Sequence, residues 1–215
     1  MSGHAWHNPN PEMIMIPKLA RLPLLTAALA LGFAAPTFAA PTVSTYAGST
    51  TVTLSPVLLN ALTSLGVKPG RQFPGELGGA TAKFPIPAGQ IDLGTAKGEI
   101  VHTGGLNLKA GATTVSLTDF VIDTTGPAPV LTGLVTANGD LVGRLPLFDI
   151  TLTSNPVIKG TGVAGSVTIN GASLALSAQA ADALNGAFGV TAFAQGIPVG
   201  TATVSAVTRN PAYIP

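Results

Sequence analysis

Short stretches in which apolar and polar residues alternate dominate the chain after residue 50. Successive side chains of a strand point to opposite faces, so this period of two is typical of strands with one buried face. Pairs of turn-forming residues, most of them containing glycine, separate the stretches. The pattern predicts strands over Thr50–Leu54, Ala80–Ile86, Gly98–Thr103, Leu106–Lys109, Thr113–Asp123, Val130–Ala137, Leu141–Thr153, Gly165–Ile169, Ser173–Leu176 and Gly200–Val207.

Two Asn-Gly pairs predict how neighbouring strands connect. Asn138-Gly139 and Asn170-Gly171 each lie between alternating segments, and Asn-Gly is the strongest short-range signal of a hairpin turn. Pro146 lies inside a strand pattern, and because proline has no N–H to donate, we expect that strand to be at an edge or interrupted there. Frequent short strands with tight turns predict a mainly β fold, an antiparallel sandwich or barrel.

A first helix is predicted directly after the first strand. Ser55-Pro56 combines an N-cap residue with proline at the first helical position. Gly66 ends the helix. The apolar stripe between them consists of Leu58, Leu62 and Leu65.

A second helix is predicted over Ala178–Ala187. Ser177 has the same capping role before it, and Gly189 ends it. Leu62 and Leu184 hold equivalent places on the two apolar stripes, so we expect both to be buried. The second stripe consists of Ala181, Leu184 and Phe188.

The two helical segments resemble each other in sequence. Val52-Thr53-Leu54-Ser55 precedes the first helix and Leu174-Ala175-Leu176-Ser177 the second, at an offset of 174 − 52 = 122 residues. Further on, Ile86-Pro87-Ala88-Gly89 matches Ile197-Pro198-Val199-Gly200. We therefore expect a strand–helix–strand unit used twice, on either side of a β meander. Coincidence in a chain rich in alanine and leucine is the other explanation.

The N-terminal part of the chain has the pattern of a secretory signal. Lys18 and Arg21 precede the apolar stretch Leu22–Ala35. That length suits a signal-peptide core and is shorter than the roughly twenty residues that span a bilayer. A short buried core helix is the other interpretation of this stretch.

The expected cleavage site defines the domain organisation. Thr37 and Ala39 fit the small residues that signal peptidase requires, so residues 1–39 are predicted to be the signal. Residues 1–12 form an upstream extension if translation starts later. Residues 40–215 are then a single exported β-rich domain, destined for the periplasm, the cell surface or the medium, without a transmembrane anchor.

Composition narrows the choice of partners. Removing residues 1–39 leaves 215 − 39 = 176 residues with eight acidic and eight basic side chains. Zero net charge argues against nucleic acid, which needs a basic surface, and against anionic membrane surfaces. That part of the chain has no cysteine and one histidine, His102, so disulfides are excluded and a structural zinc site with four Cys or His ligands cannot form.

His102 is the first candidate for a functional side chain. The period of two places Ile100 and His102 on one face of a strand, and Gly104-Gly105 allows a bulge or sharp bend with backbone open to a ligand. A functional His102 would be an axial ligand, a proton donor or a hydrogen-bond partner. A half-buried strand histidine bonded to a backbone carbonyl is the structural interpretation, and it is favoured.

No catalytic motif stands out among the remaining residues. Asp119 and Asp123 share one predicted strand and have the residue types of a glycosidase pair, but aspartates facing turns at the strand ends are the favoured interpretation. No Gly-x-Ser-x-Gly elbow is present. Gly160–Gly165 matches Gly-x-Gly-x-x-Gly without the strand-before and helix-after context of a dinucleotide site, and is predicted to be a hairpin turn.

Three stretches together carry a family resemblance. They are Gly98–Leu106, Val115–Asp123, and Ala183-Leu184-Asn185 leading to Phe193–Ala202. They resemble exported bacterial proteins of the HtaA-like kind, a β-rich group. Its characterised members are haem-binding surface modules in which a tyrosine ligates the iron and a histidine supports it.

The resemblance implies that Tyr46 would be the iron ligand and His102 its partner, both on one side of the fold. After residue 39 only His102, Tyr46 and Tyr213 are customary haem donors, because cysteine and methionine are absent. The residues by themselves favour a non-enzymatic exported structural, adhesive or binding module of the cell envelope or medium, with no metal site, no cofactor and an unidentified envelope or extracellular partner. A haem-binding HtaA-like surface module is the alternative.

Overall fold

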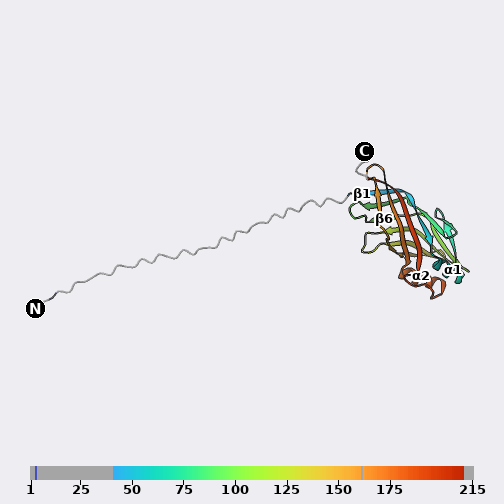
Figure 1. Ribbon diagram of the computed structural model, residues 1–215. Helices are drawn as coiled ribbons and strands as arrows, with labels where there is room; N and C mark the ends of the chain where they lie inside the picture. Colours follow the sequence, from blue (N-terminus) through green and yellow to red (C-terminus); the bar gives the residue numbers. More distant parts are fainter. Residues whose placement is uncertain (1–2, 4–40, 161, 211–215) are drawn as a thin grey trace. The chain divides into compact units, whose positions relative to one another are not determined.

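The helices and strands of the computed structural model lie within residues 41–160 and 162–210, which together with residue 3 are the residues that the structure describes (Figure 1). The predicted secretory signal lies outside the described residues. In chain order the elements are β1 (Thr42–Leu54), α1 (Pro56–Ser64), β2 (Lys68–Gln72), β3 (Glu76–Gly78), β4 (Thr81–Pro85), β5 (Ala88–Asp92), β6 (Gly98–Val101), β7 (Gly105–Ala110), β8 (Thr113–Asp123), β9 (Val130–Ala137), β10 (Asp140–Thr151), β11 (Val157–Lys159), β12 (Gly165–Leu176), α2 (Ala178–Phe188) and β13 (Pro198–Arg209).

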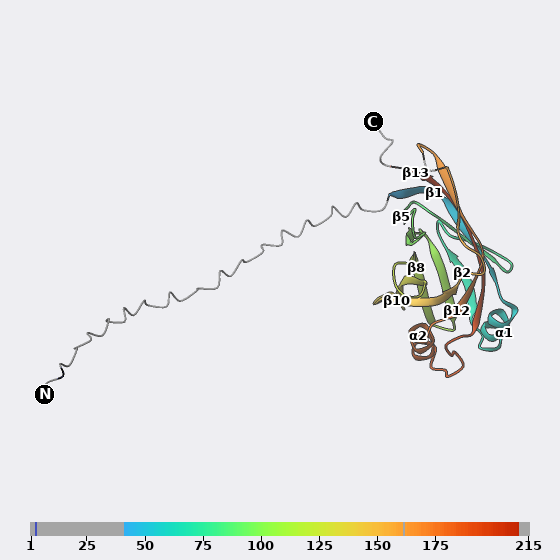
Figure 2. The same ribbon diagram turned by 60° about the vertical axis from the view of Figure 1, so that its left-hand side comes forward.

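Eight of the strands form a ring in which every neighbouring pair is antiparallel. From β13 the order runs through β12, β10, β9, β8, β6 and β5 to β1, which pairs with β13 again. Figure 2 shows β1, β13 and β12 as the long strands of one wall. The mainly β, antiparallel prediction is confirmed, and the arrangement is a barrel-like ring of strands.

The core fills the inside of the ring because the strands alternate. In β13 the even-numbered side chains from Ala202 to Thr208 are buried, whereas Thr201, Thr203 and Ser205 are exposed. The neighbouring strand β1 follows the same rule near its end, with Val52 buried and Thr53 exposed. One face of each strand therefore builds the interior and the other meets solvent.

The ring divides in the middle of one wall. β4 and β5 follow each other along β1, and β6 and β7 follow each other along β8. β5 pairs with β6, but among the described strands no pairing joins β4 to β7; β3 extends β4 and β2 extends β7. His102 and Thr103 lie where these strands diverge, and the Thr103 N–H donates to the carbonyl of Pro85 at 3.0 Å.

Both helices lie at the same end of the ring (Figures 1 and 2). Ser55 Oγ accepts a hydrogen bond from the Leu58 N–H, and Ser177 Oγ accepts one from the Ala180 N–H, each at 3.0 Å. These are the capping interactions that satisfy otherwise unpaired helix donors. Gly189 ends α2 in the left-handed conformation, with φ of 66°. The two helices are confirmed, as is the burial of Leu62 and Leu184.

One hairpin prediction is wrong. Asn170-Gly171 lies inside the continuous strand β12 and does not end it. The pairing with β13 shifts between Ile169 and Ala172, and Gly171 has φ of 68°, so the glycine forms a β-bulge in place of a turn. Asn138-Gly139 does form the β9–β10 turn, as predicted, with positive φ at both residues.

Several strands were also missed or cut short. β1 begins at Thr42, eight residues before the expected start. The missed strands are short or contain Pro and Gly, and they form through pairing with partners far away in sequence, which no local pattern reveals. They are β2, β3, β5 and β11.

Pro146 is accommodated as predicted. It pairs with Thr132 of β9 beside a register shift, and the pairing of β10 with β12 begins only at Phe148. Pro146 therefore lies in the part of β10 whose second edge is not paired to β12, where a missing N–H costs no ladder hydrogen bond.

Candidate functional site

His102 lies inside the ring, just after β6. Its side chain is 1% exposed, and its backbone N–H donates to the carbonyl of Phe120 in β8 at 2.8 Å. The bend that follows uses Gly104, with φ of 80°, because a side chain there would collide with the backbone of Gly75. The space beside the double glycine is therefore filled by the backbone at Gly75, and is not open to a ligand as the sequence suggested.

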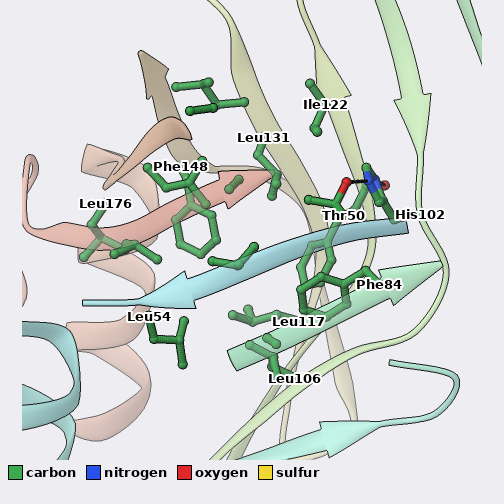
Figure 3. A pocket seen from close by; sticks show the side chains of 18 of the residues that line it. Thr50, Leu54, Phe84, His102, Leu106, Leu117, Ile122, Leu131, Phe148 and Leu176 are labelled. Atoms are coloured by element: carbon green, nitrogen blue, oxygen red, sulfur yellow. Dashed lines mark hydrogen bonds between the residues drawn. The ribbon is translucent and has the colours of Figure 1, made fainter. Parts of the chain in front are cut away.

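Both ring nitrogens of His102 have partners. Nε2 lies 2.6 Å from Thr50 Oγ1, and Nδ1 lies 3.3 Å from the carbonyl oxygen of Phe120 (Figure 3). A carbonyl only accepts, so Nδ1 carries the proton of the neutral ring, and Nε2 accepts from the Thr50 hydroxyl. Burial lowers the pKa of His102 from 6.5 to about 4, which keeps the ring neutral near neutral pH.

An apolar cavity of about 90 Å³ lies beside this pair. Its lining runs from Leu62 of α1 and Leu184 of α2, at the helix end, to Thr124 and Leu152 beyond the far ends of β8 and β10. The lining is aliphatic and aromatic apart from Thr50, Thr124 and His102, as Figure 3 illustrates. A cavity with such walls favours an apolar group over water.

A larger, open cleft lies at the end of the ring away from the helices. It has a volume of about 640 Å³ and is bounded by the turns at 93–97 and 124–129 and by the segment 152–158. Most of its lining is aliphatic or proline, and Lys97 is its one charged side chain among the described residues. The cleft and the inner cavity share four lining residues, Ile122, Thr124, Leu152 and Ile169.

Tyr46 lies elsewhere. It occupies a bulge in β1 opposite β13, its side chain is 44% exposed, and the guanidinium of Arg209 lies 5.3 Å from its ring centre. Tyr46 lines neither the cavity nor the cleft. The structure therefore does not bring Tyr46 and His102 together around one cavity, and Tyr213 lies outside the described residues.

The two aspartates are held in local hydrogen bonds. Asp119 is exposed at a bulge of β8 with φ of 49°, and its carboxylate accepts from the Thr118 hydroxyl at 3.0 Å. Asp123 accepts from the side chain and backbone of Thr125, which lowers its pKa. Neither lines the cavity or the cleft, and no cluster of three His, Cys, Asp or Glu side chains occurs within residues 41–160 and 162–210.

Thr50 and Lys97 were not predicted as site residues from the sequence. Thr50 has the same parity as the apolar residues Val52 and Leu54, so the alternation of β1 already places a hydroxyl inside the ring. Lys97 gives no such signal, because it lies in a turn whose position depends on how β5 and β6 pair.

Comparison with known proteins identifies the fold. No protein-family model and no curated protein matches the sequence. Among solved structures, the C-terminal domain of HtaA from Corynebacterium glutamicum matches 77% of this chain and 99% of its own length, at 15% identity and a TM-score of 0.58. This chain has the HtaA fold.

A second HtaA domain gives the same result. The N-terminal domain of HtaA from the same organism matches 75% of this chain and 97% of its own length, at 13% identity and a TM-score of 0.55. HtaB of that organism, named as a heme binding protein, matches at 13% identity and a TM-score of 0.49. The HtaA resemblance seen in the sequence is thus confirmed for the fold, whereas identities this low do not transfer a ligand.

The donor set can be tested against haem on this structure. The cleft has room for a large apolar ligand, but its lining contains no His, Tyr, Cys or Met. His102 has both nitrogens engaged beside a cavity of about 90 Å³, and Tyr46 lines neither this cavity nor the cleft. The cleft therefore fits the body of such a ligand, and its lining offers no axial donor to the iron.

Proposed function

We propose that the chain is an exported, non-enzymatic binding module whose ligand has an apolar body and an acidic group and occupies the cleft opposite the helices. The observation that carries this proposal is an open cleft of about 640 Å³ that shares four lining residues with the apolar inner cavity. Within the described residues no helix is long and apolar enough to cross a membrane.

The walls of the cleft favour an apolar body. Binding sites for small molecules are concave and mainly apolar, with a few polar groups that fix orientation. Here Leu152 and Ile158 line one side and Ile91 and Ile100 another, while proline residues stiffen the turns between them. Ile91 and Ile100 are already buried, whereas Leu152 and Ile158 are partly exposed. Filling the cleft would remove the exposed parts of Leu152 and Ile158 from water, which is favourable in proportion to the area covered.

Lys97 supplies the polar contact. Its ammonium group donates to the carbonyl of Gly126 at 3.2 Å, which orients the side chain across the two turns and leaves two N–H donors for a ligand. A carboxylate at the rim would complete a charge-assisted hydrogen bond. Fatty acids and porphyrins both combine an apolar body with carboxylates.

Haem is the first ligand to test, because the resemblance to HtaA-like proteins implies it and the HtaA fold supports a binding role. Coordination by Tyr46, supported by His102, stays the hypothesis drawn from the sequence. Binding in the cleft makes a different prediction, because it uses the porphyrin body and its carboxylates and requires no axial ligand from these two residues.

A titration with three probes separates these hypotheses. The chain is titrated with haemin, with metal-free protoporphyrin IX and with oleate, followed by Soret absorbance or displacement of a fluorescent apolar probe. Binding in the cleft predicts that haemin and protoporphyrin bind with similar affinity, that Lys97→Met weakens both, and that Tyr46→Ala and His102→Ala leave them unchanged. Lys159→Met, which removes an exposed lysine of β11 outside the cleft, is the matched control.

Other outcomes have equally definite meanings. Loss of haemin binding in Tyr46→Ala would show that iron coordination by Tyr46, and not the cleft, holds haemin. Oleate binding without porphyrin binding would assign the cleft to a linear acid. Absence of binding by all three probes would contradict the proposal and favour a structural or adhesive module.

A further inference from the structure

A row of exposed hydroxyl groups crosses five strands on the outer surface of the ring. Its members are direct cross-strand partners, so their side chains lie on one face. All five residues are exposed. In order across β4, β1, β13, β12 and β10 they are Thr81, Thr53, Thr201, Ser173 and Thr151.

A partial second row follows two residues along the central strands. Thr51 of β1 is opposite Thr203 of β13, and Ser49 is opposite Ser205. The two central strands therefore present matched series of hydroxyls to solvent, because alternate residues share a face. No charged residue lies between Ser49 and Thr53 or between Thr201 and Ser205, and the second row ends in β4 at Lys83, the partner of Thr51.

The hydroxyls of the main row have no structural role in hydrogen bonding within the described residues. Within the described residues, none of the five side chains of the main row makes a hydrogen bond to another protein group, in contrast to the Thr and Ser side chains that cap helices or close turns. Pairing between neighbouring threonines accounts for a modest stabilisation of the sheet. It does not account for five uncharged, exposed and unpartnered hydroxyls in register.

The opposite outer wall lacks this regularity. There the corresponding row runs through Asn107, Ser116 and Thr136 and is bounded by Gly70 and Leu141. Nearby hydroxyls of that wall are engaged, since Thr118 donates to Asp119 and Thr132 accepts from Arg144. The wall of β4, β1, β13, β12 and β10 is thus distinct in its chemistry.

From this row we infer that the outer wall binds an extended, uncharged polysaccharide chain laid across the strands. Hydroxyls donate and accept, so they match the hydroxyls of a neutral sugar. The five residues of the row carry no charge, and the nearest exposed charges of β4 and β3 on this face, Lys83 and Glu76, lie opposite each other beside the row, so a charged polymer would find no series of counter-charges along it. Neighbouring strands are about 4.8 Å apart, close to the length of one pyranose unit in an extended chain. Each strand therefore offers one hydroxyl per sugar.

The twist of the sheet selects a single chain over a flat crystalline surface. Adjacent strands rotate by roughly 20° relative to one another, so a row across five strands curves in space. A polymer chain follows such a path, whereas a rigid lattice would touch only its middle. This site is separate from the cleft, whose lining includes none of the five row residues.

The test is affinity electrophoresis through gels that contain hydroxyethyl-cellulose, a neutral extended glycan, or its charged counterpart carboxymethyl-cellulose. The row variant is Thr53→Val with Thr201→Val, which removes two hydroxyls while keeping β-branched side chains that favour strands. The matched control, Ser116→Ala with Thr136→Val, removes a cross-strand hydroxyl pair from the opposite wall. Melting temperatures verify that both variants are folded.

We expect the neutral glycan to retard the wild type and the control. The row variant should bind at least roughly tenfold more weakly, as loss of two hydrogen bonds implies. Absence of retardation by the neutral glycan, equal retardation of the row variant, or retardation by the charged polymer alone would overturn the inference. So would sedimentation showing a wild-type dimer that the row variant abolishes, because the wall would then be the contact between two copies.

Discussion

The two ends of the ring are bounded by different structural elements, helices at one end and turns at the other. At the helix end, α1 and α2 place Leu62 and Leu184 into the interior, and each helix begins with a serine cap. At the other end there is no helix among the described elements; turns with several prolines surround the cleft, and two buried threonines, Thr45 and Thr208, have hydroxyls without a hydrogen-bond partner in the described protein.

The difference indicates that the helix end mainly stabilises the fold and that the open end is suited to binding. Burial of aliphatic side chains and satisfied helix caps stabilise the fold at the helix end. The open end carries exposed apolar walls and unpaired buried hydroxyls, both of which cost free energy in the absence of a partner. Binding sites are commonly found in such less stable regions, and substitutions at the two ends should therefore differ in their effect on stability.

The largest expected effect comes from the helix end. Leu184→Ala and Leu62→Ala each remove a side chain that is at least nine-tenths buried, and the free energy of unfolding should fall by about 2–5 kcal/mol in each variant. Thermal or urea unfolding measures the change.

Leu152→Ala, at the rim of the cleft, is the control for these truncations, because Leu152 is 36% exposed and should lose less than either helix leucine. Unchanged melting temperatures for both helix variants would show that the helices are not docked on the ring.

The next effect is a pH dependence centred on His102. Because its pKa is lowered from 6.5 to about 4 in the folded protein, the unfolded chain binds more protons between these values. The free energy of unfolding should have its full value above pH 6.5 and should fall by about 3 kcal/mol as the pH drops toward about 4. Urea unfolding at a series of pH values measures this slope.

His102→Leu removes the titrating group and should abolish the slope in that window, whatever it costs in stability at pH 7. Asp92 and Asp123 do not produce the slope of stability against pH that is assigned to His102. Turn hydrogen bonds, chiefly from Thr95 to Asp92 and from Thr125 to Asp123, lower their pKa values below 3.8. Their stabilisation is present above that pH and is lost only as the pH falls through these lowered values. An unchanged slope in His102→Leu would contradict the assignment.

Local sequence patterns identified the strongly periodic elements and missed those that depend on distant partners. β8, β9 and both helices follow from alternation or capping residues within a dozen positions. The bulge at Gly171 and the strand β5 depend on the register of β12 against β13 and of β1 against β5. His102 was found because histidine is rare in this chain, but its partner Thr50 lies fifty-two residues away and only the pairing of strands brings the two together.

A smaller effect is expected at the helix caps. Ser177 Oγ accepts from the Ala180 N–H and donates to the carbonyl of Pro146 at 2.7 Å, so Ser177→Ala leaves two backbone groups without partners. Loss of a cap costs about 1 kcal/mol. Ser55→Ala breaks the equivalent bonds to Leu58 and Pro198 at a more exposed position, where water replaces the hydroxyl. Urea unfolding should therefore show a larger loss for Ser177→Ala than for Ser55→Ala, and the reverse order would contradict this account of the caps.

The smallest and opposite effect is expected at the open end. Thr45 and Thr208 are direct cross-strand partners, 3% and 0% exposed. A buried hydroxyl without a partner destabilises the folded state, and its replacement by an apolar group of the same shape is close to neutral or stabilising. Thr208→Val should therefore leave the free energy of unfolding unchanged or raise it. Thr50→Val is the matched comparison: the same substitution inside the same ring deprives His102 Nε2 of its donor and should cost about 1–3 kcal/mol. Urea unfolding of the two variants side by side decides the matter, because a large loss in Thr208→Val would reveal a partner for its hydroxyl and remove the contrast between the two ends.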